Sequence, residues 1–268
     1  MALYARESGP GDAPSIVLLH GGGASGWTWQ LQLEHLGDYH CLVPDLPEHG
    51  KSLAEGPFSI KGAAEQVLSL IRERTHGGRA HVVGLSLGGQ VAAQILASGP
   101  EVVDHAILSG TSVRLMPGMA IFSRPAMVKL TEAIVRLWWP FRDRAFWVHA
   151  NMKYYSIPPR FEPEYREELC QFTPGALMRI TVGESLRFRL PPGIGRAQAP
   201  TLVVVGQREY GVVYQSARDL VAALPHAHGC IAARVGHNWS LEAPELFTQM
   251  IRAWITDQPL PAELLPLK

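Results

Sequence analysis

The chain has 268 residues, of which 47% are hydrophobic, and its 24 acidic side chains balance its 24 basic ones. This length is enough for one large α/β domain or for a core domain with an insertion. The zero net charge favours neither a nucleic acid nor an anionic membrane over neutral partners, so we expect an uncharged or weakly charged small-molecule ligand. Residues 1–14 contain no apolar leader, and no later stretch approaches the roughly 20 apolar residues of a membrane span, which predicts a cytoplasmic protein.

Short runs of β-branched residues and leucine recur along the chain and predict buried strands. They lie at 16–19, 41–43, 82–85, 106–108 and 202–205, with a weaker run at 230–235. Because these runs are apolar on both faces, they suit a parallel sheet with helices on both sides. Apolar residues at helical spacing lie between them, for example at 63–71 and 87–96, and again at 246–255. This alternation predicts a doubly wound α/β fold.

The segment 112–199 interrupts this alternation. It contains no run typical of a buried strand and is rich in proline and aromatic residues. We therefore expect a core domain formed by residues 1–111 and 200–268, with residues 112–199 inserted as a helical cap over the active edge of the sheet. The three cysteines, Cys41, Cys170 and Cys230, are too widely spaced for a disulfide framework or a metal-ligand pair, which predicts buried reduced thiols.

A Gly-x-Ser-x-Gly pentapeptide follows the run at 82–85 and opens the helical pattern at 87–96. A serine on such a sharp strand-to-helix turn needs neighbours without side chains, and Gly84 and Gly88 meet that need. The turn lifts the hydroxyl clear of the sheet and aims the free amides of the helix toward developing negative charge. Ser86 is therefore the candidate nucleophile; the alternative is a glycine turn that only packs the helix on the strand.

A serine hydroxyl needs a base to take its proton and a carboxylate to orient that base. His237 follows the last weak strand, at the edge of the sheet that also carries Ser86, and is the candidate base. Glu209 is the acidic residue in the loop after 202–205 and is the candidate acid. Because its side chain is one methylene longer than that of aspartate, either the loop retracts or the side chain folds back. The alternatives are a structural histidine and a surface ion pair between Glu209 and Arg208.

Acyl transfer also needs hydrogen-bond donors for the oxygen that becomes negative. The glycine run at 21–23 follows the first predicted strand, and we expect the backbone amides of Gly22 and Leu87 to form this oxyanion hole. No Gly-Lys-Ser/Thr ending or dinucleotide spacing accompanies the run, so a phosphate-binding loop is disfavoured. The sequence predicts neither a cofactor nor a metal.

Together these residues resemble the α/β-hydrolase family, in its chain order of nucleophile, acid and histidine. The resemblance rests on His20-Gly-Gly-Gly, the turn at 45–52, the elbow at Ser86, the loop at Glu209 and Gly236-His237, and it covers nearly the whole chain. It implies an α/β-hydrolase fold, a serine carboxylesterase activity on a small apolar ester, and a turn containing Asp45 and His49 that orders the floor of the site.

The sequence departs from the family pattern at two positions. Glu48 stands where relatives usually carry glycine, which indicates either a backbone without the usual positive φ or a local adaptation. Glu209 stands where most relatives carry aspartate. Two other functions remain open: hydrolysis of a carbon–carbon bond in a dienoic diketone, with Arg187 or Arg189 holding a substrate carboxylate, and ligand binding without hydrolysis.

Overall fold

The computed structural model describes residues 3–115, 121 and 124–267. They form an eight-stranded sheet in the order β1-β3-β2-β4-β5-β6-β7-β8. The strands from β3 through β7 pair in parallel, whereas β1 and β8 join the two edges antiparallel. The strands are β1 (Ala5–Ser8), β2 (Ser15–Leu19), β3 (His40–Pro44), β4 (Ala80–Leu85), β5 (Val103–Ser109), β6 (Thr201–Gly206), β7 (Ala227–Ala232) and β8 (Leu264–Pro266).

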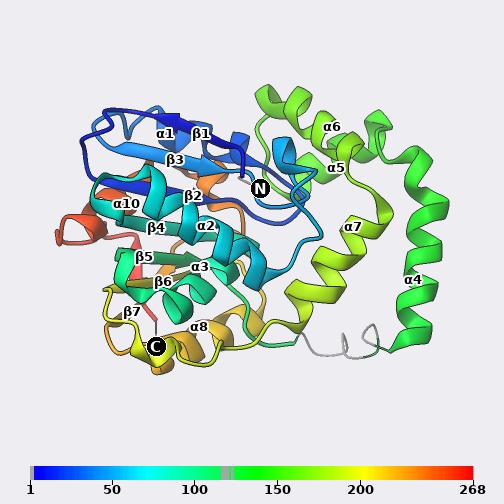
Figure 1. Cartoon of the computed structure of the whole chain (residues 1–268). Helices are drawn as coiled ribbons and strands as arrows, with labels where there is room; N and C mark the ends of the chain where they lie inside the picture. The colour runs from blue at the N-terminus through cyan, green and yellow to red at the C-terminus, as the bar shows by residue number, and fades with distance from the viewer. Residues whose placement is uncertain (1–2, 116–120, 122–123, 268) are drawn as a thin grey trace.

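Helices cover both faces of this sheet (Figure 1). One face packs against α2 (Ile60–Arg74), α3 (Leu87–Ser98) and α8 (Gly211–Ala223), and the other against α10 (Pro244–Ile255), with the short α1 (Gln30–Leu33) and α9 (Trp239–Glu242) nearby. Successive residues of one strand enter opposite cores: Val17 joins the first and Leu18 the second. The predicted doubly wound α/β fold is confirmed.

The observed strands differ from the predicted ones at the edges. β1 and β8 were not predicted, because they are short and partly exposed and so lack an apolar run on both faces. The strand predicted from the weak run at 230–235 lies earlier in the chain than expected, since β7 ends at Ala232 and Val235 lies beyond it. Cys41 and Cys230 are buried free thiols as expected, whereas Cys170 is a free thiol that is exposed, contrary to the prediction.

Between β5 and β6, the described residues form helices and turns and no strand: α4 (Pro125–Trp138), α5 (Ala145–Tyr154), α6 (Glu162–Gln171) and α7 (Pro174–Met178), followed by a π-helix at Arg179–Glu184. Figure 1 shows these helices beyond the carboxyl ends of the central strands, with α4 farthest from the sheet. Val148, Met152 and Tyr165 form a small core of their own between α5 and α6. None of the described helices is long and apolar enough to cross a membrane.

Candidate active site

Ser86 occupies a strained turn between β4 and α3. Its backbone has φ 56° and ψ −111°, a conformation that a residue with a side chain rarely adopts. The Ser86 N–H donates a hydrogen bond to the carbonyl of Ser109 at the end of β5, over 2.8 Å. A side chain on Gly84 would place its Cβ 2.3 Å from the Gly88 carbonyl oxygen, and one on Gly88 would lie 2.2 Å from that of Leu19. The turn therefore requires both glycines for steric reasons.

The loops after β6 and β7 bring Glu209 and His237 together. Nδ1 of His237 lies 2.8 Å from Oε2 of Glu209, so this carboxylate accepts the Nδ1 proton and leaves Nε2 as an acceptor. The Glu209 side chain is only 1% exposed, whereas the imidazole is 39% exposed. Burial lowers the pKa of His237, but the hydrogen bond and the charge of Glu209 together raise it by more, so this pKa lies above its ordinary value.

Glu209 folds back toward its own strand, one of the two arrangements that its length predicted. Its Oε1 accepts a hydrogen bond from the Gly206 N–H at 3.4 Å. The space for this arrangement comes from Gly110, which follows β5 with φ 59°. A Cβ at Gly110 would lie 2.9 Å from Cε1 of His237 and 3.0 Å from Oε1 of Glu209. Sequence reasoning missed the role of Gly110, because the two side chains beside it come from loops that are distant in the sequence.

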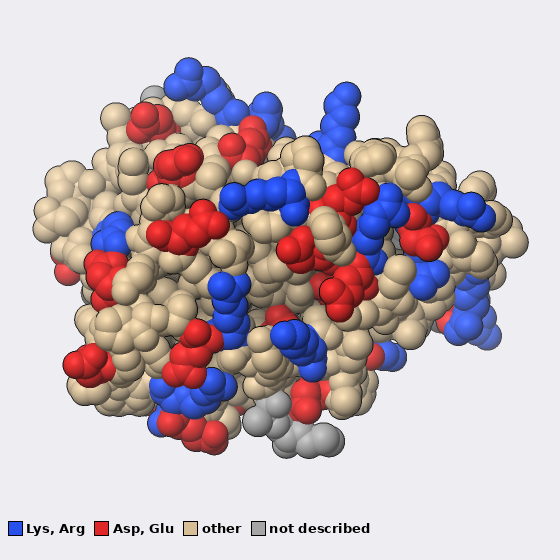
Figure 2. Space-filling model, turned by 90° about the horizontal axis from the view of Figure 1, so that it is seen from above, with Lys and Arg blue, Asp and Glu red and all other residues tan. Residues whose placement is uncertain are grey.

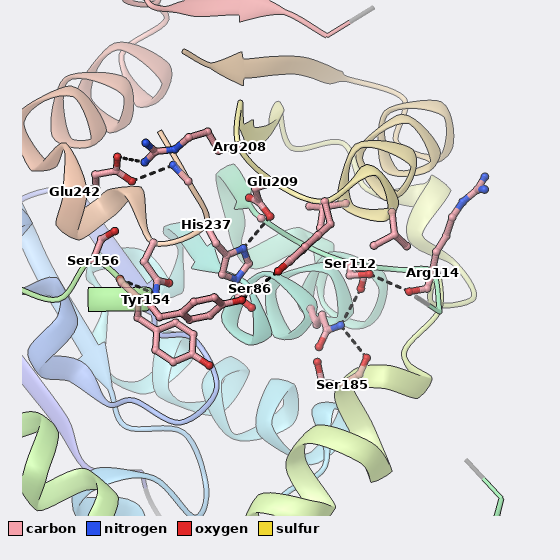
Figure 3. Close-up of a pocket in the computed structure, with 18 of the residues that line it drawn as sticks. Ser86, Ser112, Arg114, Tyr154, Ser156, Ser185, Arg208, Glu209, His237 and Glu242 are labelled. Atoms are coloured by element: carbon pink, nitrogen blue, oxygen red, sulfur yellow. Dashed lines mark hydrogen bonds and ion pairs between the residues drawn. The ribbon is translucent and has the colours of Figure 1, made fainter. Parts of the chain in front are cut away.

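One pocket of about 490 Å³ is lined by Ser86, Glu209 and His237. Figure 3 shows the imidazole between the labelled Glu209 and Ser86 side chains, at the point where the loops from three strands meet. The Ser86 hydroxyl does not cap its own helix. The pocket thus brings together a serine hydroxyl that makes no helix-capping hydrogen bond, an imidazole, and a carboxylate that is hydrogen-bonded to that imidazole.

Gly22 and Leu87, the two residues predicted to supply the amides of the oxyanion hole, lie next to each other. A Cβ at Gly22 would be 3.5 Å from Cδ2 and 3.7 Å from Cβ of Leu87, so the glycine run passes directly over the start of α3. Leu87 is the first residue of that helix, and its N–H therefore has no partner within the helix. The positive end of the helix dipole adds to the attraction for negative charge at this place.

Two buried histidines hold the glycine run in place. His20 donates Nδ1–H to the Gly21 carbonyl over 2.8 Å and accepts the Leu46 N–H at Nε2 over 2.9 Å. His49 accepts the Gly23 N–H at Nε2 over 3.4 Å. Burial lowers the pKa of His20 to about 4 and that of His49 to about 3, so both rings are neutral at neutral pH. Their hydrogen bonds therefore connect the run at 20–23 with the turn at 45–52.

Glu48 has φ 62°, so of the two alternatives for this position the backbone without a positive φ is excluded and the local adaptation remains. Glu48 adopts the left-handed backbone conformation, and two residues donate hydrogen bonds to its carboxylate. Oε2 of Glu48 accepts hydrogen bonds from the Phe58 N–H and from Nε of Arg179, each at 2.8 Å. The guanidinium of Arg179 lowers the pKa of Glu48 below its ordinary value. The local adaptation is thus an ion pair with the segment between β5 and β6.

Further contacts hold the loops around the pocket. Arg208 pairs with Glu242 rather than with Glu209, and Oε2 of Glu242 also accepts the Gly236 N–H at 3.0 Å. Glu242 therefore holds the residues that immediately precede Glu209 and His237.

Gln90, one turn after Ser86 on α3, holds two distant points of the segment between β5 and β6. Its amide nitrogen donates to the carbonyls of Ser112 at 2.8 Å and Ser185 at 3.1 Å. Because both partners are acceptors, they fix the orientation of this buried amide.

The two guanidinium groups that line the pocket are each paired with a carboxylate. Arg114 forms a two-pronged ion pair with Asp219, and Arg208 pairs with Glu242. Neither Arg187 nor Arg189 belongs to the lining of this pocket in the described part of the chain. The pocket therefore offers no unpaired cation among its described lining residues.

Comparisons with known proteins agree with this fold. Residues 16–250 match the Alpha/beta hydrolase family. A putative carbamate hydrolase of Pseudomonas syringae pv. syringae is 31% identical over 257 residues, which cover 92% of this chain and 96% of that protein. An esterase of Mycobacterium tuberculosis is 37% identical over 100 residues, or 37% of this chain and 33% of that protein. The solved structure of MenH from S. aureus superposes with a TM-score of 0.74 at 18% identity, covering 96% of this chain and 98% of that one.

Proposed function

The chain belongs to the alpha/beta hydrolase family, and we propose that within it the protein is a serine hydrolase that cleaves uncharged carboxylic esters through an acyl-enzyme. The observation that carries this proposal is the 2.8 Å hydrogen bond between Glu209 and His237, in the same pocket as a serine on a strained turn. The esterase among the relatives supports the ester as substrate class.

In the proposed acylation, Ser86 Oγ attacks the acyl carbon while Nε2 of His237 takes its proton. Glu209 keeps the ring in the tautomer that has a free Nε2 and stabilises the imidazolium that forms. The proton then passes from Nε2 to the leaving alkoxide as the bond between acyl carbon and alkoxy oxygen breaks. In deacylation water takes the place of the serine, His237 again accepts the proton, and the acid leaves as Ser86 recovers its hydrogen.

The amides of Gly22 and Leu87 are the proposed donors to the oxyanion in both steps. Each such donor contributes about 3 to 4 kcal/mol to the stabilisation of a tetrahedral intermediate. The neutral histidines His20 and His49 position the loop that carries Gly22 and act on the reaction only through it.

The ion pairs in the pocket favour an uncharged substrate. Arg114 and Arg208 each face a carboxylate of the protein already, so a substrate carboxylate would have to displace Asp219 or Glu242. This arrangement gives less support to the dienoic diketone, whose carboxylate needs a free cation. A carbamate is the second candidate, because a carbamate hydrolase matches over nearly the full length and the same nucleophile and oxyanion hole would serve it.

We also propose that residues 112–199 act as a cap over the pocket and that residues 1–111 and 200–268 form the catalytic core. Tyr154, Tyr155 and Leu186 line the pocket from the cap side. The hydroxyls of Tyr154 and Tyr210 lie 3.2 Å apart, and Nδ2 of Asn238 donates to the Tyr155 carbonyl at 3.1 Å. These contacts support a cap that touches the loops of Glu209 and His237.

The test is hydrolysis of a panel of neutral esters, lactones, carbamates and a dienoic diketone, together with covalent labelling by a fluorophosphonate. The wild-type protein should hydrolyse the neutral esters and be labelled at Ser86. Ser86→Ala should lose on the order of a million-fold in kcat, by analogy with other serine hydrolases, and should not be labelled. Hydrolysis confined to carbamates would select the second candidate. Absence of both turnover and labelling in the folded wild-type protein would instead indicate a ligand-binding member of the family.

A further inference from the structure

Helix α4 is apolar on two sides, of which only one is packed. Val135 faces inward on the side that contacts α7, and it is half-buried. Leu130, Ile134 and Leu137 recur at spacings of four and three residues and so form a stripe along a second side, where each is at least half exposed. Folding within the described chain therefore leaves this stripe uncovered.

Exposed aromatic side chains extend the stripe onto the next helix. The rings of Trp138 and Phe141, and those of Trp138 and Trp147, lie 6.2 Å apart, and Phe146 lies 5.5 Å from Trp147. Together with the stripe these residues make up the outer apolar patch, whose members are between 43% and 74% exposed: Leu130, Ile134, Leu137, Trp138, Phe141, Phe146 and Trp147. A groove of about 450 Å³ opens beside Trp138 and Trp147. Monomeric proteins rarely expose apolar clusters of this kind unless they bind something there.

The charges in the same helices have one dominant sign. Residues 124–153 contain six basic side chains, Arg124, Lys129, Arg136, Arg142, Arg144 and Lys153, against only two carboxylates, Glu132 and Asp143. Since the whole chain has a net charge of zero, this excess is local. Figure 2 shows Lys and Arg side chains, with Asp and Glu side chains among them, at its right-hand end, the end at which α4 lies in Figure 1.

Some of these cations lie directly at the outer apolar patch. The guanidinium of Arg144 lies 6.0 Å from the centre of the Phe141 ring. Lys153 follows Phe146 by seven residues on α5 and so lies on the same side of that helix. The patch therefore combines aromatic and aliphatic side chains with flexible cations at its border.

We propose that the outer apolar patch docks on the surface of an anionic lipid bilayer. Tryptophan, phenylalanine and leucine enter the boundary between headgroups and acyl chains, while lysine and arginine at the border contact anionic headgroups. A second copy of this chain fits less well, because a two-fold dimer across the patch would place its two cationic borders opposite each other. None of the patch residues lines the pocket with Ser86, and the proposal does not depend on which reaction that pocket performs.

The test measures co-sedimentation with two kinds of vesicle, one of phosphatidylcholine alone and one of equal parts phosphatidylcholine and phosphatidylglycerol. We expect binding to the mixed vesicles, weaker binding to phosphatidylcholine alone, and a decrease in the binding to mixed vesicles as salt is added. Emission from the exposed Trp138 and Trp147 should shift to shorter wavelength on binding, because their rings leave water.

Three variants separate the patch from a general effect of the surface. Trp138→Ser and Phe146→Ser should each lower the affinity for mixed vesicles by about tenfold or more, since each removes an aromatic ring from the apolar phase. Leu265→Ser is the matched control, because Leu265 is exposed to a similar degree on β8, far from α4, and it should bind as the wild type does. Circular dichroism checks that each variant is folded.

Three results would overturn the proposal. One is the absence of binding to both kinds of vesicle by the folded wild-type protein. Another is light scattering that shows a stable dimer which Trp138→Ser converts to a monomer, because a second copy would then cover the patch. Equal loss of vesicle binding in Leu265→Ser and Trp138→Ser would likewise rule out this face as the docking surface.

Discussion

A single methyl group at Gly110 should disturb the proposed catalytic pair. In Gly110→Ala, the new Cβ would lie 2.9 Å from Cε1 of His237, whereas ordinary van der Waals contact begins near 3.4 Å. The imidazole must therefore move by about 0.5 Å. A misplacement of about 1 Å costs roughly a hundredfold in rate, so we expect kcat/KM to fall by about tenfold. The positive φ of this residue adds a stability loss of about 1 kcal/mol, since alanine is strained there.

The assay is steady-state hydrolysis of an activated neutral ester, with thermal unfolding of each variant measured in parallel. Gly77→Ala is the control for backbone strain, because Gly77 has φ 70° but nothing within 4 Å of a Cβ, so it should lose stability and keep its activity. Gly211→Ala is the control for the nearby loop, since its Cβ also meets nothing within 4 Å. A folded Gly110→Ala variant whose kcat/KM stays within about twofold of the wild type would refute the steric reasoning.

Two further predictions concern pH. Activity should rise with pH as His237 loses its proton, with a midpoint above the ordinary histidine pKa of about 6.5. In Glu209→Gln this midpoint should fall, because the charge that raises the pKa of His237 is removed. Flat profiles of kcat/KM against pH, or profiles with the same midpoint in both proteins, would contradict this. His20 has a pKa of about 4 in the folded protein, so the unfolded chain binds its proton first as the pH falls below about 6.5. The free energy of unfolding should therefore decrease as the pH falls from about 6.5 to about 4, by roughly 3 kcal/mol from His20 alone. Urea unfolding midpoints that stay constant over this pH range would exclude the neutral buried state of His20.

The sheet could be predicted from the sequence because its inner strands are buried on both faces. Such strands, including β2 and β6, produce continuous apolar runs that stand out along the chain. β1 and β8 each pair with one neighbour at an edge and are partly exposed, so their sequences contain no such run.

The convergence of Glu209 and His237 also follows from the sequence, because parallel strands bring the loops at their carboxyl ends to one edge. The roles of Gly110 and Glu48 do not follow from the sequence. Gly110 matters because side chains from two loops distant in sequence lie within 3.0 Å of the place that a Cβ on this residue would take. Glu48 keeps its positive φ through an ion pair with Arg179, 131 residues away, and no local pattern in the sequence reports such a partner.

The amide of Gln90 has a mechanical consequence for the segment between β5 and β6. It holds the carbonyls of Ser112 and Ser185, so two points of that segment, one shortly after β5 and one directly after the π-helix, are attached to the helix that begins after Ser86. A rearrangement that lifted the segment off the sheet would therefore have to break hydrogen bonds one helical turn away from the reactive hydroxyl.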